Sequence, residues 1–552
     1  MQDLTKLRKV STRKTCHFAG TLTTGTALFT KASRSIYTDL SREVSAAVAD
    51  EGYELLFTSF TEEFPRSCHG FSPVLSTLGL TGTFIIPSVS QFELGDNGFQ
   101  SVLDGYGKLH KFDFDSTRNE ICYTSRMIES GFYNESQSAN RIAPGILFMN
   151  TVPPLDYNAA QKIAGPNDNS YVNTFHLGSD SGSILSLTDS QYMLKIQLET
   201  LSGASNVKFD DKLDKSKLST GSAHVLARGD CMVDIDPQSD MDGTKAKVLL
   251  FQMCPNAEGT FTRTVINSYN TSDGFLPYMH SFGLTQNYAI LPHQSFFFDY
   301  TKVVKSGKPL VEAMIDNPTA SSFEFKILPL DGSDVYTVTI DQGEPFYYFH
   351  IINSHENDAS DAVVLDLSCL SINMLPYFTL EMERTKQIRD NSTFGTVIVK
   401  RYTVYFRGPN AGKWAQETLS DPRRSTDFPN FNRALQGRPN CFFYAIQWFH
   451  DYETYADMAI LKKDTCSGEE LYWHQDNFFP SEPTFVAAKS PEGGEDDGIL
   501  LFTAVHGATK GSYLVVCDAK TMQTIDMVPV PGIVTFTTHG EWYPKVSGGK
   551  EL

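Results

Sequence analysis

The sequence lacks the short motifs that mark several common enzyme classes. It contains no G-x-S-x-G nucleophile elbow, no phosphate-binding P-loop and no H-E-x-x-H zinc motif. Gly105-Tyr106-Gly107 begins like a dinucleotide fingerprint, but a third glycine and a following helical pattern are missing. These absences argue against serine hydrolases, P-loop nucleotidases, zincin proteases and Rossmann enzymes.

Long apolar runs and basic stripes are missing too. No run reaches the roughly 18 apolar residues that a transmembrane helix needs, so we expect no membrane span. The formal net charge is −19, and the Lys and Arg residues form no recognition stripe. The sequence therefore argues against a nucleic-acid partner.

Cysteine is sparse, and the N-terminal region is almost free of acids. The nine cysteines contain no C-x-x-C pair, and this odd, scattered set indicates a reduced intracellular compartment. Residues 1–36 carry seven Lys or Arg against the single acid Asp3. Such a segment is typical of an organelle transit peptide or of a disordered basic tail. We expect a leader over residues 1–45 and a cytoplasmic or plastid location.

From Tyr53 to Pro544 the chain has a β-prone texture. Short runs of β-branched and aromatic residues are broken by Gly, Pro, Asn and Asp. The aromatic content is 12%, with 39 Phe and 24 Tyr, which suits a β-rich interior or a large apolar cavity. Near-regular short strands predict an all-β propeller, barrel or sandwich array, although no fixed-period repeat is visible. We expect one domain over residues 46–546 and a tail over residues 547–552.

Four histidines that lie in or beside β-prone runs are candidate metal ligands. They are His224, His280, His350 and His539, and the next candidates are His293 and His355. The four are far apart in sequence, so only the tertiary fold can bring them together. Neutral imidazoles without a cysteine ligand suit a borderline metal such as iron, zinc or copper. Any one of them alone is better explained as a core or loop histidine, and only the set supports a metal site.

Three acids in distinctive contexts could support these histidines. They are Asp189, Asp427 and Glu482. A metal-bound imidazole usually donates its second N–H to a carboxylate, which defines the tautomer. Prolines flank Glu482 on both sides, which is unusual for a solvated surface. Each acid by itself also fits an ordinary turn.

Taken together, these stretches resemble the carotenoid cleavage oxygenase family over roughly residues 50–545. The motifs that carry the resemblance are Leu103–His110, Ser222–His224, His280–Tyr288, Phe349–Asn353, Thr426–Asn432, Gly437–Pro439, Phe479–Pro483, Glu495–Gly498 and His539–Gly540. They occur in the family's order, which makes the match specific.

The resemblance implies a seven-bladed β-propeller, with short helices and loops capping the face that carries a non-haem Fe(II). By motif, the four iron ligands would be His224, His280, His350 and His539. The supporting carboxylates would be Asp189, Asp427 and Glu482. At two of these three positions Asp replaces the family's Glu. The shorter side chain falls short of its histidine unless the backbone compensates or a water bridges.

The implied activity is cleavage by O₂ of a conjugated C=C bond in a carotenoid or apocarotenoid, giving two carbonyl products. The resemblance also implies a hydrophobic polyene substrate and peripheral membrane association. Phe282 and Tyr348 are candidate walls of an apolar tunnel, and they equally fit the core. A Pro-Asp-Pro-Cys stretch of the animal branch is absent, which argues against its isomerase activity. Two alternatives remain: cleavage of a stilbene-type phenolic alkene, and an iron-free carotenoid or retinoid binding propeller.

Overall fold

The computed structural model describes residues 50–544, apart from residues 156–167, 177–181, 191, 210–212, 214–217, 241–244, 256–259, 272–274, 392–394 and 489–493. All described residues belong to one compact unit, Ala46–Leu552. The predicted leader over residues 1–45 and the predicted tail over residues 547–552 lie outside the described residues. Among the helices that are described, none combines the length and apolar character that crossing a membrane requires.

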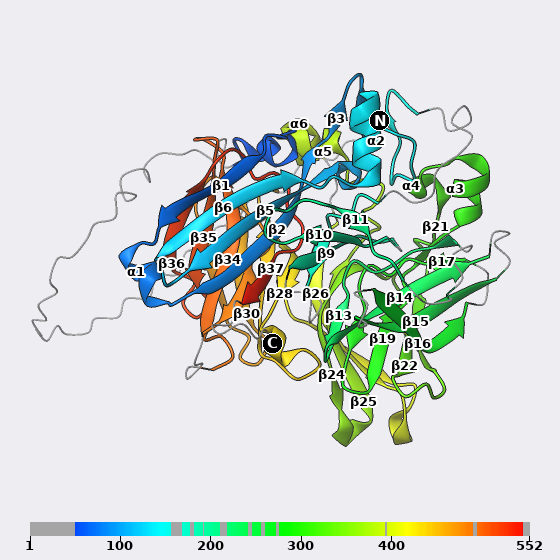
Figure 1. Cartoon of the computed structure of the whole chain (residues 1–552). Coiled ribbons are helices and arrows are strands. Elements are labelled where there is room, and N and C mark those ends of the chain that lie inside the picture. The colour runs from blue at the N-terminus through cyan, green and yellow to red at the C-terminus, as the bar shows by residue number, and fades with distance from the viewer. Residues whose placement is uncertain are drawn as a thin grey trace, which may run out of the picture. The chain divides into compact units, whose positions relative to one another are not determined.

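The fold is a seven-bladed β-propeller, as the resemblance predicted (Figure 1). Within the described ranges, seven sheets of four or five strands follow one another along the chain, and we number the blades in that order. Every strand pair is antiparallel, so neighbouring strands need only short connections.

The strands of blades one to four are as follows. Blade one holds β1 (Phe64–Gly70), β6 (Glu120–Met127), β5 (Tyr106–Asp115), β2 (Thr81–Gln91) and β37 (Glu541–Pro544). Blade two holds β11 (Ser205–Asn206), β10 (Leu194–Gln197), β9 (Ser183–Leu187) and β8 (Asn173–Phe175). Blade three holds β12 (Leu218–Ser219) and β13 (Leu226–Arg228), both paired with β14 (Cys231–Ser239), then β15 (Ala246–Pro255) and β16 (Phe261–Asn270). Blade four holds β18 (Gly283–Leu284), β19 (Tyr288–Pro292), β22 (Ser322–Pro329) and β23 (Tyr336–Asp341).

The remaining strands form blades five to seven and two small sheets. Blade five holds β24 (Tyr347–Asn357), β25 (Ala362–Leu370), β26 (Val397–Tyr405) and β27 (Trp414–Thr418). Blade six holds β28 (Ser425–Asn430), β29 (Phe442–Trp448), β30 (Ala459–Asp464) and β31 (Glu470–Trp473). Blade seven holds β32 (Phe478–Pro480) and β33 (Thr484–Ala487), both paired with β34 (Gly498–His506), then β35 (Gly511–Asp518) and β36 (Thr524–Val530). The small sheets are β17 (Leu276–Pro277), β20 (Phe296–Phe298), β21 (Met314–Asp316) and β3 (Glu93–Leu94), β4 (Asn97–Phe99), β7 (Thr151–Val152).

Blade one is built from both ends of the chain. Strand β37, near the C-terminus, pairs with β2, so that Glu541 lies opposite Ile85. In Figure 1 the red β37 accordingly lies against the blue β2. This pairing satisfies the edge of β2 that would otherwise be exposed, and it joins the last blade to the first.

The hydrophobic core lies between neighbouring blades. The central strand β25 is buried along its whole length, whereas the outer strand β16 is half exposed, so polar and apolar residues share it. Between blades four and five, Phe323 and Phe325 of β22 lie with their ring centroids 6.0 and 5.6 Å from that of Tyr402. Such aromatic pairs add about 0.5–1.5 kcal/mol each beyond the area they bury.

The described helices are short. They are η2 (Tyr53–Phe57), α1 (Pro73–Thr77), η3 (Val102–Asp104), α2 (Gly131–Ala139), α3 (Tyr300–Ser306), α4 (Leu310–Ala313), η4 (Asp358–Ser360), α5 (Leu380–Arg384), α6 (Lys386–Asn391), η5 (Gly408–Asn410) and η6 (Arg433–Leu435). In Figure 1, α2 to α6 lie in the upper part of the view, whereas α1 lies at its left. Residues of η2, η3 and the start of α4 line a cavity of about 220 Å³. The predicted cap of short helices and loops is therefore present.

Six of the nine cysteines form disulfides, a pairing that the sparse and scattered cysteines of the sequence did not predict. The bridges are Cys68–Cys122, Cys231–Cys254 and Cys441–Cys466. Cys68 and Cys122 lie directly opposite each other on β1 and β6. Among the described cysteines, Cys369 and Cys517 are free and buried. Strand register creates these pairs, and the spacing of cysteines along the chain does not show it.

Candidate metal centre

The four predicted histidines meet near the propeller axis, and each comes from a different blade. They are His224 between β12 and β13, His280 between β17 and β18, His350 within β24, and His539 just before β37. One nitrogen of each lies within 4.8 Å of one nitrogen of every other. Among the described residues, His293 and His355 do not belong to this cluster.

The imidazoles point their Nε2 atoms toward a common centre. The Nε2 atoms of His224 and His280 are 3.0 Å apart, and those of His350 and His539 are 3.1 Å apart. The ring centroid of His224 lies 4.3 Å from that of His539 and 5.1 Å from that of His350. Nitrogen atoms from four blades thus converge on one point, as the ligands of a single ion would.

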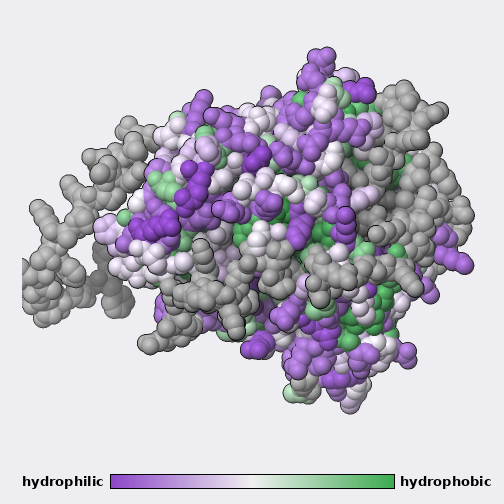
Figure 2. Space-filling model, in the orientation of Figure 1, coloured by the Kyte–Doolittle hydropathy of each residue, from purple (hydrophilic) through white to green (hydrophobic). Residues whose placement is uncertain are grey.

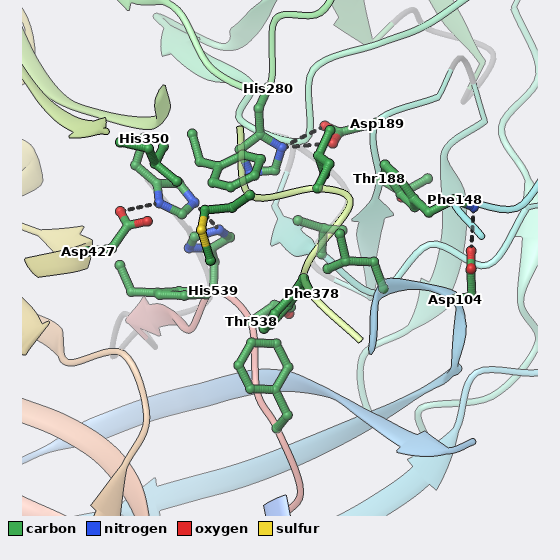
Figure 3. A pocket seen from close by; sticks show the side chains of 18 of the residues that line it. Asp104, Phe148, Thr188, Asp189, His280, His350, Phe378, Asp427, Thr538 and His539 are labelled. Atoms are coloured by element: carbon green, nitrogen blue, oxygen red, sulfur yellow. Dashed lines mark hydrogen bonds and ion pairs between the residues drawn. The ribbon is translucent and has the colours of Figure 1, made fainter. Parts of the chain in front are cut away.

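Three of the histidines receive a carboxylate at Nδ1, and the carboxylates come from the other three blades. His280 Nδ1 lies 2.8 and 2.9 Å from the two carboxylate oxygens of Asp189, as Figure 3 shows. His350 Nδ1 lies 2.7 Å from Asp427 Oδ1, and His539 Nδ1 contacts Glu482 Oε2. An ionised carboxylate only accepts hydrogen bonds, so each of these Nδ1 atoms carries the proton and each Nε2 keeps its lone pair.

The shorter aspartates reach their histidines directly. At Asp427 the backbone supplies the missing length, because the pairing of β28 with β29 shifts between Asp427 and Asn430, and Phe428 has a φ of 53°. Asp189 is held by two further donors, the Tyr278 hydroxyl at 2.7 Å and the Ala223 N–H at 3.1 Å. Of the alternatives that the sequence left open, direct contact through a shifted backbone is the one seen at Asp427, and Asp189 also reaches its histidine without a bridging water.

His224 differs from the other three, since no carboxylate is seen at its Nδ1 among the described residues. Its backbone N–H donates to Ser222 Oγ at 2.9 Å, and the Ser222 hydroxyl donates to the His280 carbonyl at 2.7 Å. This bridge ties the two histidine loops of blades three and four together. The orientation of His224 thus comes from the backbone of its loop.

Burial keeps two of the imidazoles, those of His224 and His539, neutral. It lowers the pKa of His224 and His539 well below the ordinary histidine value, and the neighbouring histidines add to the effect. Burial also raises the pKa of Glu482 well above its ordinary value. Lone pairs that converge at 3 Å and a buried carboxylate both require a positive charge nearby, so this donor set fits a divalent cation.

A cavity of about 220 Å³ opens on one side of the histidines. His280, His350 and His539 form its polar wall. Aromatic and aliphatic side chains form most of the rest, and the phenylalanines among them are Phe57, Phe148, Phe349, Phe378, Phe428 and Phe536. Figure 3 looks into this cavity and shows His280, His350 and His539 on one side and Phe378 on another. Such a cavity suits an apolar ligand held beside a metal.

Of the two readings of Phe282 and Tyr348, the core is the one that the structure shows, and neither lines this cavity. The Tyr348 ring is buried between blades, and its hydroxyl donates to the carbonyls of Ser281 and Pro292. Phe349, the residue after Tyr348, lines the cavity instead, because side chains alternate along a strand. Tyr278 lines the cavity too.

Sequence reasoning missed three residues of the site. Phe428 lies with its ring 5.2 Å from His350 and 5.4 Å from His539, centroid to centroid. Asp104 lies on the cavity wall, accepts the N–H groups of Phe148 and Met149, and has its pKa raised to about 7 by burial. Tyr278 is the third. Tyr278 and Phe428 stand within two positions of a predicted residue, and that proximity was the available signal.

Known proteins are similar to this chain in sequence and in fold. A family model described as retinal pigment epithelial membrane protein matches residues 78–544. The carotenoid cleavage dioxygenase 8 of Arabidopsis thaliana chloroplasts is 24% identical over 497 residues, covering 84% of this chain and 82% of that protein. The beta,beta-carotene 15,15'-dioxygenase of Rattus norvegicus is 24% identical over 524 residues, covering 84% and 87%. A variant of the Synechocystis apocarotenoid oxygenase superposes with a TM-score of 0.74 at 20% identity, covering 90% of this chain and 99% of that one.

Proposed function

The chain belongs to the retinal pigment epithelial membrane protein family, and from this premise we propose that it is an Fe(II)-dependent carotenoid oxygenase. It cleaves a conjugated C=C bond of a carotenoid or apocarotenoid with one O₂, so that each carbon of the bond becomes a carbonyl carbon. The iron is held by the Nε2 atoms of His224, His280, His350 and His539. Asp189, Asp427 and Glu482 orient three of these ligands.

The observation that carries the proposal is the position of the four Nε2 atoms beside the aromatic cavity. Three of the four histidines belong to the wall of that cavity, so any apolar ligand inside it lies against the metal centre. When bound, Fe(II) supplies the electrons and open positions that let O₂ react with an electron-rich double bond. The histidines are neutral, so the site keeps the full charge of the cation.

The aromatic wall positions the substrate. Phe428 contacts the rings of His350 and His539, and Phe536 lies with its centroid 6.0 Å from Phe428. Phe57 stacks on Phe536 at 5.4 Å. This row of rings leads away from the histidines and offers flat faces to a conjugated chain. It also excludes water from the double bond that lies next to the metal centre.

The two alternative functions differ in what the site would need. An iron-free binding protein would be expected if the two aspartates were too short to support their histidines. The carboxylate oxygens of both aspartates lie 2.7–2.9 Å from the histidine Nδ1 atoms. This geometry favours an enzyme. The phenolic alkene reading needs a polarised phenol site, so a stilbene belongs among the test substrates.

Delivery of the substrate concerns the protein surface. Carotenoids dissolve in membranes, and we propose that the protein docks peripherally. Tyr377 is 57% exposed and lies next to the cavity residues Leu375 and Phe378 in sequence. On the face shown in Figure 2, hydrophilic residues cover most of the coloured surface and apolar areas are small. Its compartment, cytoplasm or plastid, stays a prediction.

The test loads the purified protein with Fe(II) under anaerobic conditions and measures bound iron. Products from β-carotene, an apocarotenal and resveratrol are then identified by mass spectrometry. We expect about one iron per chain and an aldehyde from at least one carotenoid substrate. Iron below about a tenth of an equivalent would exclude the oxygenase. Bound iron with cleavage of resveratrol alone would assign the phenolic alkene reaction.

A further inference from the structure

A second, smaller cavity of about 40 Å³ lies against the same histidines. His350 and His539 line both cavities. His224 lines only the small cavity, and His280 lines only the large one. Each cavity is therefore bounded by a different set of three imidazoles. The metal centre separates two compartments.

The small cavity lies along the propeller axis. Its wall includes Leu226 of β13, Gly283 of β18, Ile352 of β24 and Pro429 of β28. These strands belong to four different blades, and each is the strand nearest the axis in its blade. We call this space the axial cavity. The polyene cavity, in contrast, is walled by the helices and loops of the cap.

Two of the polar side chains that line the axial cavity, Ser354 and Arg433, are suited to bind a ligand. Ser354 is 1% exposed, and its hydroxyl has no hydrogen-bond partner among the described residues. Gly283 leaves it room, since a Cβ on that residue would come within 2.9 Å of Ser354 Oγ. Arg433 is exposed and lies in the wall of the same cavity. A buried hydroxyl that lines a cavity and has no partner is available to donate a hydrogen bond to a ligand there.

We propose that the axial cavity binds a small anion against the His224, His350 and His539 side of the metal centre, separately from the polyene. The inference rests on the metal centre of the proposed function. Ser354 donates its hydroxyl to the anion, and Arg433 supplies a positive charge at the same cavity.

The charges around the centre support an anion on this side. Asp189, Asp427 and Glu482 each contact a histidine at Nδ1, on the side of the ring away from the shared centre. An anion that enters the axial cavity thus meets positive charge from both the metal and the arginine.

The size of the cavity restricts the ligand. A volume of about 40 Å³ holds one water-sized molecule comfortably, as a buried water needs only about 10–15 Å³ by the same kind of measure. A two- or three-atom ion fits, and a polyene does not. Azide is therefore a suitable probe.

The experiment uses the full chain loaded with Co(II), whose absorption spectrum changes when a ligand binds. Metal content is measured first, so failure to bind metal, which would contradict the proposed function, is recognised separately. Azide is then titrated with the polyene cavity empty and with it filled by a long-chain alcohol. We expect the same azide affinity in both conditions. An azide signal that disappears when the polyene cavity is filled would overturn the inference.

Variants test the two polar groups. Ser354→Val removes the hydroxyl and fills the axial cavity with a methyl group, and we expect azide affinity to fall by about tenfold or more. Ser368→Val is the matched control, because Ser368 of β25 is also fully buried with an unpartnered hydroxyl but lines neither cavity. Equal azide affinities for the two variants would overturn the inference.

Arg433→Gln changes an exposed residue, so the fold tolerates it. We expect azide affinity to fall about threefold at low salt and to lose most of its salt dependence. An unchanged affinity and salt dependence would remove Arg433 from the site and overturn the anion specificity. These measurements report on the spectrum of the bound metal and do not depend on turnover.

Discussion

Asp427 Oδ1 lies 2.7 Å from His350 Nδ1, although an aspartate side chain is one methylene shorter than the glutamate of the related family. The contact is possible because β28 bulges at this point, with the following Phe428 in the left-handed region. A backbone irregularity therefore compensates for a side-chain deletion, and the histidine keeps its proton on Nδ1.

Asp427→Ala should weaken metal binding by about 10–100-fold, because His350 loses the carboxylate that orients it. The measurement is a competitive titration with a metal chelator. Asp457→Ala is the matched control. Asp457 Oδ1 lies 2.9 Å from Nε2 of a different histidine, His474, which does not belong to the cluster. Equal affinities for both variants would assign Asp427 a purely structural role.

His280→Ala should abolish iron binding, with less than about a tenth of an equivalent retained, because the site loses one of its four donors and Asp189 loses the imidazole that it orients. Metal analysis after anaerobic loading measures this. His293→Ala provides the comparison, as His293 contacts the Tyr269 hydroxyl at 2.5 Å and stands outside the cluster. Retention of a full equivalent of metal by the His280 variant would contradict the assigned ligand set.

Phe349→Leu should loosen the position of the polyene, because Phe349 lines the large cavity with its centroid 5.6 Å from that of His280. We expect KM to rise and cleavage to spread over more than one double bond, as measured by the product distribution. Phe282→Leu is the matched control, since it makes the same chemical change in the packed core, outside the large cavity. It should lower stability and leave the product distribution intact. The reverse result would restore Phe282 as a tunnel wall.

Glu383 should make stability depend on pH. Burial raises its pKa from 4.5 to about 7, although the hydroxyl of Tyr53 and the charge of Arg389 partly oppose the shift. The folded protein therefore binds this proton more tightly than the unfolded chain does. The stabilisation is complete below pH 4.5, falls as the pH rises to about 7, and amounts to about 3 kcal/mol.

Glu383→Gln should remove this part of the pH dependence, measured as the difference in free energy of unfolding between pH 5 and pH 8. Glu381→Gln is the matched control on the same helix, since Glu381 is exposed. A variant at Glu383 with the same pH dependence as the unchanged protein would show that another group is responsible.

Much of the architecture was predictable from local patterns. Alternating β-prone runs between Tyr53 and Pro544 indicate an all-β fold, because strand propensity and turn residues act over a few positions. The motifs around His224, His280, His350 and His539 identified the residues that meet near the axis, because each motif is local and keeps its order along the chain.

Other features depend on how distant strands align. The cysteines Cys68 and Cys122 are 54 residues apart and pair only because β1 and β6 align in register. The choice between Tyr348 and Phe349 as a tunnel wall depends on one position of strand phase. The shorter side chain of Asp427 is compensated by a bulge in β28, and no residue type in the sequence indicates that bulge.

The stretch His280–Tyr288 illustrates the division. Its residue types and their company along the chain determined that His280 is a candidate ligand in a β-propeller. Only the tertiary structure decided that Asp189 of blade two holds its Nδ1, that Tyr278 supports Asp189, and that His280 faces the large cavity whereas His224 faces the axial one. The physical reason is that propensity and motif act over a few residues, whereas a site shared by seven blades is defined by contacts between residues up to hundreds of positions apart.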